Sequence, residues 1–216
     1  FDLKHISWET RAEEYRIICR IVGGEEQDRE HVLVLLQRQF GKSKIRRGCY
    51  TPELLLFEAL KETGKTIAGA ESCTGGLVAK LITDIAGSSA VFWGAVTAYS
   101  NDAKKKILGV SEDIIYEYGA VSKETVENMA AELLKKANTD YSFAVSGVAG
   151  PSGGTPKKPV GTVWIAVSAD NGNVYSKVFQ FHGSRERIRR KAATAALIMC
   201  ETIVRKYGLL DRDRGI

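Results

Sequence analysis

The chain has 216 residues, of which 44% are hydrophobic, and a formal net charge of +5. This length is enough for one principal domain with a small additional module. Its longest apolar stretches fall far short of the roughly 20 residues that a membrane-spanning helix needs, and no basic segment followed by an apolar one opens the chain. We therefore expect a soluble cytoplasmic protein with no membrane partner.

The cysteines and histidines give no sign of a metal site. Four cysteines and three histidines are present, and they are widely and irregularly spaced. Neither a disulfide framework nor a set of zinc ligands has this spacing. The sequence therefore predicts reduced thiols and chemistry that uses no metal and no cofactor.

Residues 1–50 form a small α+β segment at the N-terminus. One strand is predicted over 15–22 and an amphipathic helix over 25–40, separated by Gly23 and Gly24. A unit of this size cannot cover its own apolar face, so we expect it to pack on the rest of the chain, on a partner or on a preceding domain. The G-x-x-G clamp of one class of RNA-binding module is missing, because Glu25 and Glu26 follow the glycines.

From residue 51 onward, helices and strands alternate. Helices are predicted over 52–63, from 77, over 102–108, over 122–137 and over 185–207, and strands over 66–70, 91–99, 141–146, 160–168 and 173–181. The last two strands form an antiparallel hairpin across Asp170-Asn171-Gly172. This order predicts an α/β fold over 51–211, a three-layer α/β/α sandwich with a mixed sheet.

The segment Glu71-Ser72-Cys73-Thr74-Gly75-Gly76 joins a strand to a helix. Ligands of α/β folds gather at this edge of the sheet, where helix N-termini present free N–H groups. Ser72 is thus a candidate nucleophile, and the N–H groups of Thr74, Gly75 or Gly76 are candidates to stabilise an oxyanion. The alternative is that Ser72 or Thr74 only caps the helix, which spacing alone favours.

A serine nucleophile needs a base, and with so few histidines the candidates are Tyr99 and Lys104. Both lie where a predicted strand passes into a helix, on the same edge as Ser72. A lysine that is desolvated or close to other cations loses its proton more easily. The alternative is a solvated surface run, because Lys104 is followed by two further lysines.

A glycine-rich stretch over 147–154 also follows a strand. Its N–H groups could hold a phosphate, with a generic mobile loop as the alternative. The stretch lacks the Gly-Lys-Ser/Thr ending of a P-loop. ATP is therefore an improbable ligand.

Taken together, five motifs resemble one known family over about 52–207. They are Ala70-Glu71-Ser72-Cys73-Thr74-Gly75-Gly76, Tyr99-Ser100-Asn101-Asp102-Ala103-Lys104, Gly119-Ala120-Val121-Ser122, Ser146-Gly147-Val148-Ala149-Gly150-Pro151 and Lys158-Pro159-Val160-Gly161-Thr162-Val163-Trp164. In this order they resemble the nicotinamide mononucleotide deamidases (nicotinamide-nucleotide amidohydrolases), the C-terminal domain of the competence/damage-inducible CinA proteins.

The resemblance implies hydrolysis of the carboxamide of nicotinamide mononucleotide to nicotinic acid mononucleotide and ammonia, in pyridine nucleotide salvage. It implies that Ser72 attacks, that Tyr99 and Lys104 accept its proton, and that an acyl-enzyme forms. The substrate phosphate needs donors, and our candidates are Arg185 and Arg189. The other candidate substrate-binding residues are Thr74, Gly75, Gly76, Asn101 and Gly147.

Two alternatives remain beside the deamidase. One is a catalytically inactive nucleotide-binding or assembly domain of a larger CinA-type protein, with residues 1–50 as the remnant of its connecting region. The other is a basic nucleic-acid-binding module, which we rank last because no aromatic stacking platform lies among the basic clusters. The family also implies a homo-oligomer, most simply a homodimer, with a small-molecule substrate and no nucleic acid.

Overall fold

The computed structural model describes residues 5–12, 16–42, 45, 47, 48 and 50–213. The chain forms two compact units, Phe1–Tyr50 and Thr51–Ile216. Within the described ranges, no helix combines the length and the apolar character that a membrane span requires.

The first unit is a β-hairpin followed by a helix. Strands β1 (Ile6–Ala12) and β2 (Ile17–Gly23) pair antiparallel, and helix α1 (Glu26–Phe40) follows. The predicted α+β character is confirmed, but β1 was missed, and the start of the predicted strand at residue 15 lies outside the described residues. Within the described part of this unit only Val32 is buried. Its hydrophobic core is therefore minimal.

The second unit is built on one five-stranded sheet with the order β4-β3-β5-β6-β7. The strands are β3 (Ile67–Glu71), β4 (Phe92–Thr97), β5 (Tyr141–Gly147), β6 (Thr162–Ala169) and β7 (Val174–Gln180). The strand pairs β3–β4 and β3–β5 are parallel, whereas β5–β6 and β6–β7 are antiparallel. The predicted mixed sheet is confirmed.

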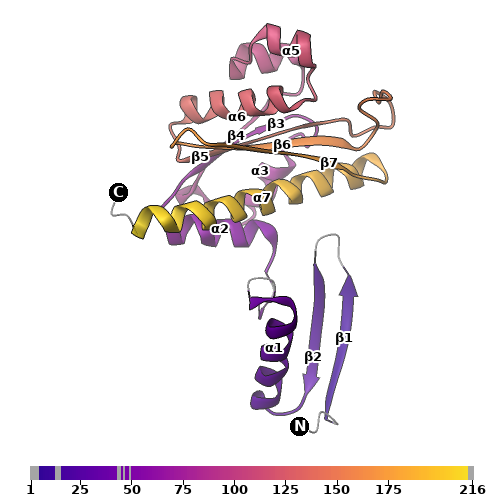
Figure 1. Cartoon of the computed structure of the whole chain (residues 1–216), viewed down its shortest axis with the longest axis vertical. Coiled ribbons are helices and arrows are strands. Elements are labelled where there is room, and N and C mark those ends of the chain that lie inside the picture. Colours follow the sequence, from indigo (N-terminus) through magenta and orange to yellow (C-terminus); the bar gives the residue numbers. More distant parts are fainter. Residues whose placement is uncertain (1–4, 13–15, 43–44, 46, 49, 214–216) are drawn as a thin grey trace. The chain divides into compact units, whose positions relative to one another are not determined.

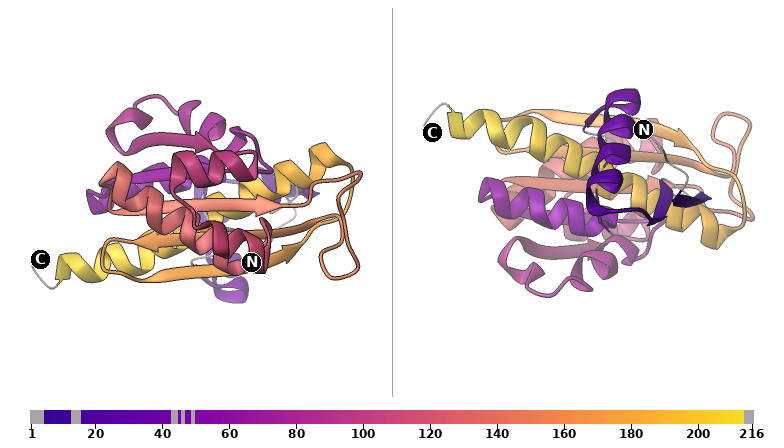
Figure 2. Two further views of the ribbon diagram at one scale, coloured as in Figure 1. Left: turned by 90° about the horizontal axis from the view of Figure 1, so that it is seen from above. Right: turned by 90° about the horizontal axis from the view of Figure 1, so that it is seen from below.

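Helices cover both faces of this sheet (Figures 1 and 2). One face carries α6 (Lys123–Ala137) with α5 (Glu112–Tyr118) beyond it, and the other carries α7 (Arg185–Asp213), α2 (Pro52–Thr63) and α3 (Leu77–Thr83). The three-layer α/β/α sandwich is therefore confirmed. The shorter elements are η2 (Ser88–Ala90), α4 (Asn101–Ala103) and the π-helix η3 (Lys104–Leu108).

The two faces of the sheet differ in side-chain size. Successive side chains of a strand point to opposite faces of the sheet. Every second residue therefore packs against α7 and α2, and the residues between them pack against α6. The α7 face carries large apolar side chains such as Ile67, Phe143 and Ile165. The α6 face is mainly alanine, with Ala68, Ala70, Ala144 and Ala166 buried beneath Val126, Met129 and Leu133 of α6. Small side chains here let α6 pack close to the sheet.

Local signals set the ends of several helices. Thr51 accepts a hydrogen bond from the Leu54 N–H at the start of α2, and Gly64 ends that helix in the left-handed region with φ 68°. Ser122 caps α6 by accepting from the Thr125 N–H. Both helices therefore begin where the sequence predicts. Helix α5 was missed, and α7 continues beyond the predicted 207 to Asp213.

Candidate active site

The turn that carries Ser72 leaves the fully buried interior strand β3. The Ser72 N–H donates to the Val145 carbonyl at 2.9 Å, which fixes the residue against β5. Gly75 and Gly76 adopt φ values of 60° and 88°, a left-handed backbone that favours glycine. The tight turn therefore holds Ser72 at the carboxyl edge of the sheet.

Glu71 caps the helix that follows this turn. Its carboxylate is fully buried and accepts hydrogen bonds from the N–H groups of Gly76 at 2.9 Å, Val78 at 3.1 Å and Ala79 at 2.8 Å. A negative charge at a helix N-terminus is favoured by the free N–H groups and by the helix dipole. The backbone N–H groups at the start of α3 therefore have a buried side chain as their hydrogen-bond acceptor.

This capping changes the expected oxyanion donors. The Gly76 N–H is taken by Glu71, and the Gly75 N–H donates to the Ser72 carbonyl at 3.1 Å. Among the described residues, the Thr74 N–H donates to no backbone or side-chain acceptor. Of the three predicted donors, only Thr74 keeps a free N–H, and none of the three residues lines the pocket described below.

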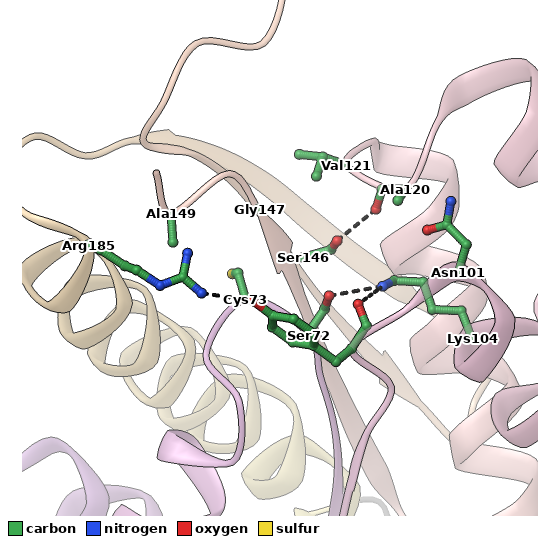
Figure 3. Close-up of a pocket in the computed structure, with 11 residues that line it drawn as sticks. Ser72, Cys73, Asn101, Lys104, Ala120, Val121, Ser146, Gly147, Ala149 and Arg185 are labelled. Atoms are coloured by element: carbon green, nitrogen blue, oxygen red, sulfur yellow. Dashed lines mark hydrogen bonds between the residues drawn. The ribbon is translucent and has the colours of Figure 1, made fainter. Parts of the chain in front are cut away.

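Lys104 is buried beside Ser72 with only 1% of its surface exposed. Its Nζ lies 2.9 Å from Ser72 Oγ, 3.0 Å from the Ala98 carbonyl oxygen and 3.4 Å from the Tyr99 carbonyl oxygen (Figure 3). The interpretation of this lysine as solvated surface is therefore wrong. The wide turn of η3 directs both Lys104 and Leu108 inward.

Burial controls the charge of Lys104. Desolvation lowers its pKa below the ordinary lysine value, and no carboxylate in the described part of the chain forms an ion pair with it. By contrast, Lys105 pairs with Glu112 and Lys106 pairs with Asp102 on the surface. Of the three consecutive lysines, Lys104 alone is suited to accept a proton.

Cys73 lies next to Ser72 and also lines the pocket. Burial raises the pKa of its thiol to about 12. Because the thiolate is the nucleophilic form of cysteine, Cys73 is protonated and unreactive at neutral pH. Ser72 is therefore the better nucleophile of the two.

The Tyr99 hydroxyl contacts Arg185 and not Ser72. Tyr99 is 58% exposed, and its hydroxyl accepts a hydrogen bond from Arg185 Nη2 at 2.7 Å. Arg185 Nη1 donates to the Gly150 carbonyl at 2.8 Å. Within the described residues, no hydrogen bond joins the Tyr99 hydroxyl to Ser72 or Lys104; only its backbone carbonyl reaches Lys104.

The two candidate arginines of α7 have different surroundings. Arg185 lines the pocket, whereas Arg189 donates from Nε to the Cys73 carbonyl at 3.2 Å and from Nη2 to the Thr74 carbonyl at 2.7 Å. Arg189 thus stabilises the turn that carries Ser72, and it is not among the pocket-lining residues. Arg185 is the arginine available to a ligand.

These side chains surround one pocket of about 260 Å³. Its lining residues are Ser72, Cys73, Tyr99, Asn101, Lys104, Ala120, Val121, Ser146, Gly147, Ala149 and Arg185. The lining carries two basic side chains and no carboxylate, which suits an anionic ligand. The structure therefore brings together Ser72, Lys104, Tyr99, Asn101, Gly147 and Arg185 of the predicted site, and leaves Thr74, Gly75, Gly76 and Arg189 outside the cavity (Figure 3).

Sequence reasoning missed two contributors. Ser146 is the second-last residue of strand β5, and Ser72 directly follows β3. The place of Ser146 at the carboxyl edge of the sheet was therefore a usable signal. Glu71 gave no such signal, because helix-capping side chains normally stand immediately before the helix, whereas Glu71 lies several residues earlier in a strand.

Comparison with known proteins places the chain in a family. The sequence model of the CinA C-terminal domain matches residues 51–204. The chain belongs to this family. The expected resemblance is thereby confirmed.

Curated relatives of the CinA C-terminal domain include enzymes. The nicotinamide-nucleotide amidohydrolase PncC of Enterobacter agglomerans is 49% identical over 149 residues, which cover 69% of this chain and 89% of that protein. PncC of Escherichia coli (strain K12) is 49% identical over 140 residues, covering 65% and 85%. A CinA-like protein of Syntrophomonas wolfei is 52% identical over 138 residues, 64% of this chain and 33% of its own length. The chain thus spans about a third of the length of this CinA-like relative.

Solved structures agree with this assignment. The crystal structure of the competence/damage inducible protein CihA from Agrobacterium tumefaciens has a TM-score of 0.67 and 38% sequence identity, and the match covers 72% of this chain and 96% of that one. A CinA superfamily protein from Klebsiella pneumoniae gives a TM-score of 0.68 at 30% identity. The second unit therefore has the CinA fold.

Proposed function

We propose that this chain hydrolyses the carboxamide of nicotinamide mononucleotide to nicotinic acid mononucleotide and ammonia, with Ser72 as the nucleophile. The observation that carries the proposal is the 2.9 Å contact between Lys104 Nζ and Ser72 Oγ inside a buried site. Relatives that are 49% identical bear the name of this activity.

Lys104 is the proposed general base. A neutral amine has two N–H groups and one lone pair. The carbonyls of Ala98 and Tyr99 can accept the two N–H groups, which leaves the lone pair directed at the Ser72 hydroxyl. Desolvation favours this neutral form because it lowers the pKa of Lys104.

The reaction then proceeds in two halves. Ser72 Oγ bonds to the carboxamide carbon while its proton passes to Lys104, which gives a tetrahedral intermediate with a negatively charged oxygen. The carbon–nitrogen bond breaks as Lys104 returns the proton to the leaving group, which departs as ammonia. Water next attacks the acyl-enzyme and gives its proton to Lys104; Ser72 regains a proton as the carboxylic acid is released.

Arg185 is the proposed partner of the substrate phosphate. It lines the pocket on the other side of Ser72 from Lys104 (Figure 3). Hydrogen bonds to the Tyr99 hydroxyl and the Gly150 carbonyl hold its guanidinium in place. A planar guanidinium suits phosphate oxygens because it offers several donors in a fixed geometry. Asn101 and Gly147 would contact the remainder of the nucleotide.

The setting of this activity follows the family resemblance. We propose a role in pyridine nucleotide salvage in the cytoplasm, with the protein acting as a homodimer. The second candidate function is a catalytically inactive nucleotide-binding or assembly domain, which is favoured by the CinA-like relatives that are about three times as long as the matched region.

Ammonia release from nicotinamide mononucleotide by the full chain tests the proposal. Ser72→Ala and Lys104→Met should each lower the rate by at least about a hundred-fold, whereas a metal chelator should not change it. Nucleotide binding without turnover by the unmodified chain would favour the inactive domain. Full activity in Ser72→Ala would show that the nucleophile is another group.

A further inference from the structure

A second serine lies in the wall of the pocket. Ser146 ends the buried part of strand β5, is only 1% exposed and lines the cavity with Ser72 and Lys104. Its Oγ donates a hydrogen bond to the Ala120 carbonyl at 2.6 Å (Figure 3). Because a carbonyl oxygen can only accept, the one hydroxyl hydrogen of Ser146 is committed to this bond. The oxygen therefore has only lone pairs left to offer a ligand.

Ser146 is tied to the nucleophile through the sheet. The Ser72 N–H donates to the carbonyl of Val145, the residue before Ser146. Because Ser72 and Ser146 both line the cavity, a group attacked by Ser72 lies close to the end of β5 that carries the Ser146 hydroxyl.

We infer that Ser146 Oγ accepts a hydrogen bond from the NH₂ of the substrate carboxamide and thereby selects a carboxamide over a carboxylate. This inference rests on the proposed function. A carboxamide NH₂ is a donor and matches the free lone pairs of Ser146, whereas a carboxylate presents only acceptor oxygens and is repelled. The Arg185 guanidinium attracts anions, so without such an acceptor the acid product would be held in the pocket.

Equilibrium binding to the full chain tests the inference without turnover. In a Ser72→Ala background, titration calorimetry compares the Kd values of nicotinamide mononucleotide and nicotinic acid mononucleotide. Adding Ser146→Ala should reduce the preference for the amide by about three- to ten-fold, the effect of one lost hydrogen bond. Ser146→Thr keeps the hydroxyl and should keep the preference.

Strand β5 supplies a matched control. Ser142 lies on the same face of the strand, is fully buried and donates from Oγ to the Ala130 carbonyl at 2.7 Å, but it does not line the pocket. Ser142→Ala in the same background should leave the preference unchanged. An unchanged preference in Ser146→Ala, or an equal loss in Ser142→Ala, would overturn the inference.

The outcomes separate this inference from the proposed function. Ammonia release by the unmodified chain with no effect of Ser146→Ala on the preference refutes the role of Ser146 alone. A preference that depends on Ser146, together with no ammonia release, refutes the proposed activity alone. Failure of both nucleotides to bind refutes both.

Discussion

Lys104 Nζ lies 2.9 Å from Ser72 Oγ, although Lys104 is the first of three consecutive lysines. Three neighbouring oxygens surround the amine, and all three belong to neutral groups. Burial without a nearby carboxylate makes the charged form costly. The arrangement stabilises a neutral lysine next to a hydroxyl.

The pH dependence of the reaction should report this lysine. Because burial lowers the pKa of Lys104, its neutral form is populated below the ordinary value of 10.5. We expect kcat/KM for nicotinamide mononucleotide to rise with pH and to reach its plateau below pH 10.5. A pH–rate profile measures this rise and the pH at which it ends. If the rate still rises in proportion to hydroxide above pH 10.5, a lowered lysine pKa does not control the reaction.

Glu71→Gln should weaken the fold and the site together. In the unmodified protein, both carboxylate oxygens of Glu71 accept hydrogen bonds from backbone N–H groups. Glutamine keeps one acceptor oxygen, but its NH₂ group would face N–H groups that also need an acceptor. We expect a loss of about 1–3 kcal/mol in the free energy of unfolding, measured by urea denaturation.

Glu62→Gln is the control for that substitution. Glu62 is about half exposed and pairs with Arg205 on the surface, so its loss should cost at most about 1 kcal/mol. Equal effects of the two substitutions would contradict the capping role of Glu71.

Arg185→Lys should weaken binding of the substrate through its phosphate. Lysine cannot reproduce the fixed donors of the guanidinium, so we expect KM for nicotinamide mononucleotide to rise about ten-fold or more while kcat changes little. The riboside, which lacks the phosphate, should show no such change. Arg190→Lys, at an exposed position five residues along α7, is the control. A similar loss for nucleotide and riboside would mean that Arg185 does not bind the phosphate.

Tyr99→Phe distinguishes two roles for this residue. If the hydroxyl holds Arg185, its removal should raise KM and leave kcat within about three-fold, because one hydrogen bond is lost. If the hydroxyl relays the Ser72 proton, kcat should fall by about a hundred-fold or more with KM unchanged. Steady-state kinetics with nicotinamide mononucleotide separate these outcomes, and the contact with Arg185 favours the first.

The sequence predicts most of the second unit because its signals are local. Thr51 and Pro52 mark the start of α2, and Gly64 marks its end, independently of distant residues. Strand β1 was missed because it is defined by its pairing with β2 and not by a pattern of its own. In this pairing Ile6 lies opposite Gly23. Its charged side chains and lack of buried residues conceal that pairing.

Site geometry was predictable only in part, because tertiary neighbours decide it. Arg185 and Arg189 are one helical turn apart and look equivalent in the sequence. What separates them is the acceptor each one meets: the Tyr99 hydroxyl and Gly150 carbonyl in one case, and the carbonyls of the Ser72 turn in the other. The burial of Lys104 likewise depends on the sheet beneath it and on the π-turn, which residue type does not reveal.

The alanine layer under α6 has a consequence for the cavity. Ala120 and Val121 form one of its walls and lead directly into the Ser122 cap of α6, so the wall is joined to the helix. Alanine side chains on the sheet set the height of that helix above it. The packing of α6 on the sheet therefore sets the width of the cavity. Evolution can change that width through the volume of core residues that never touch a ligand.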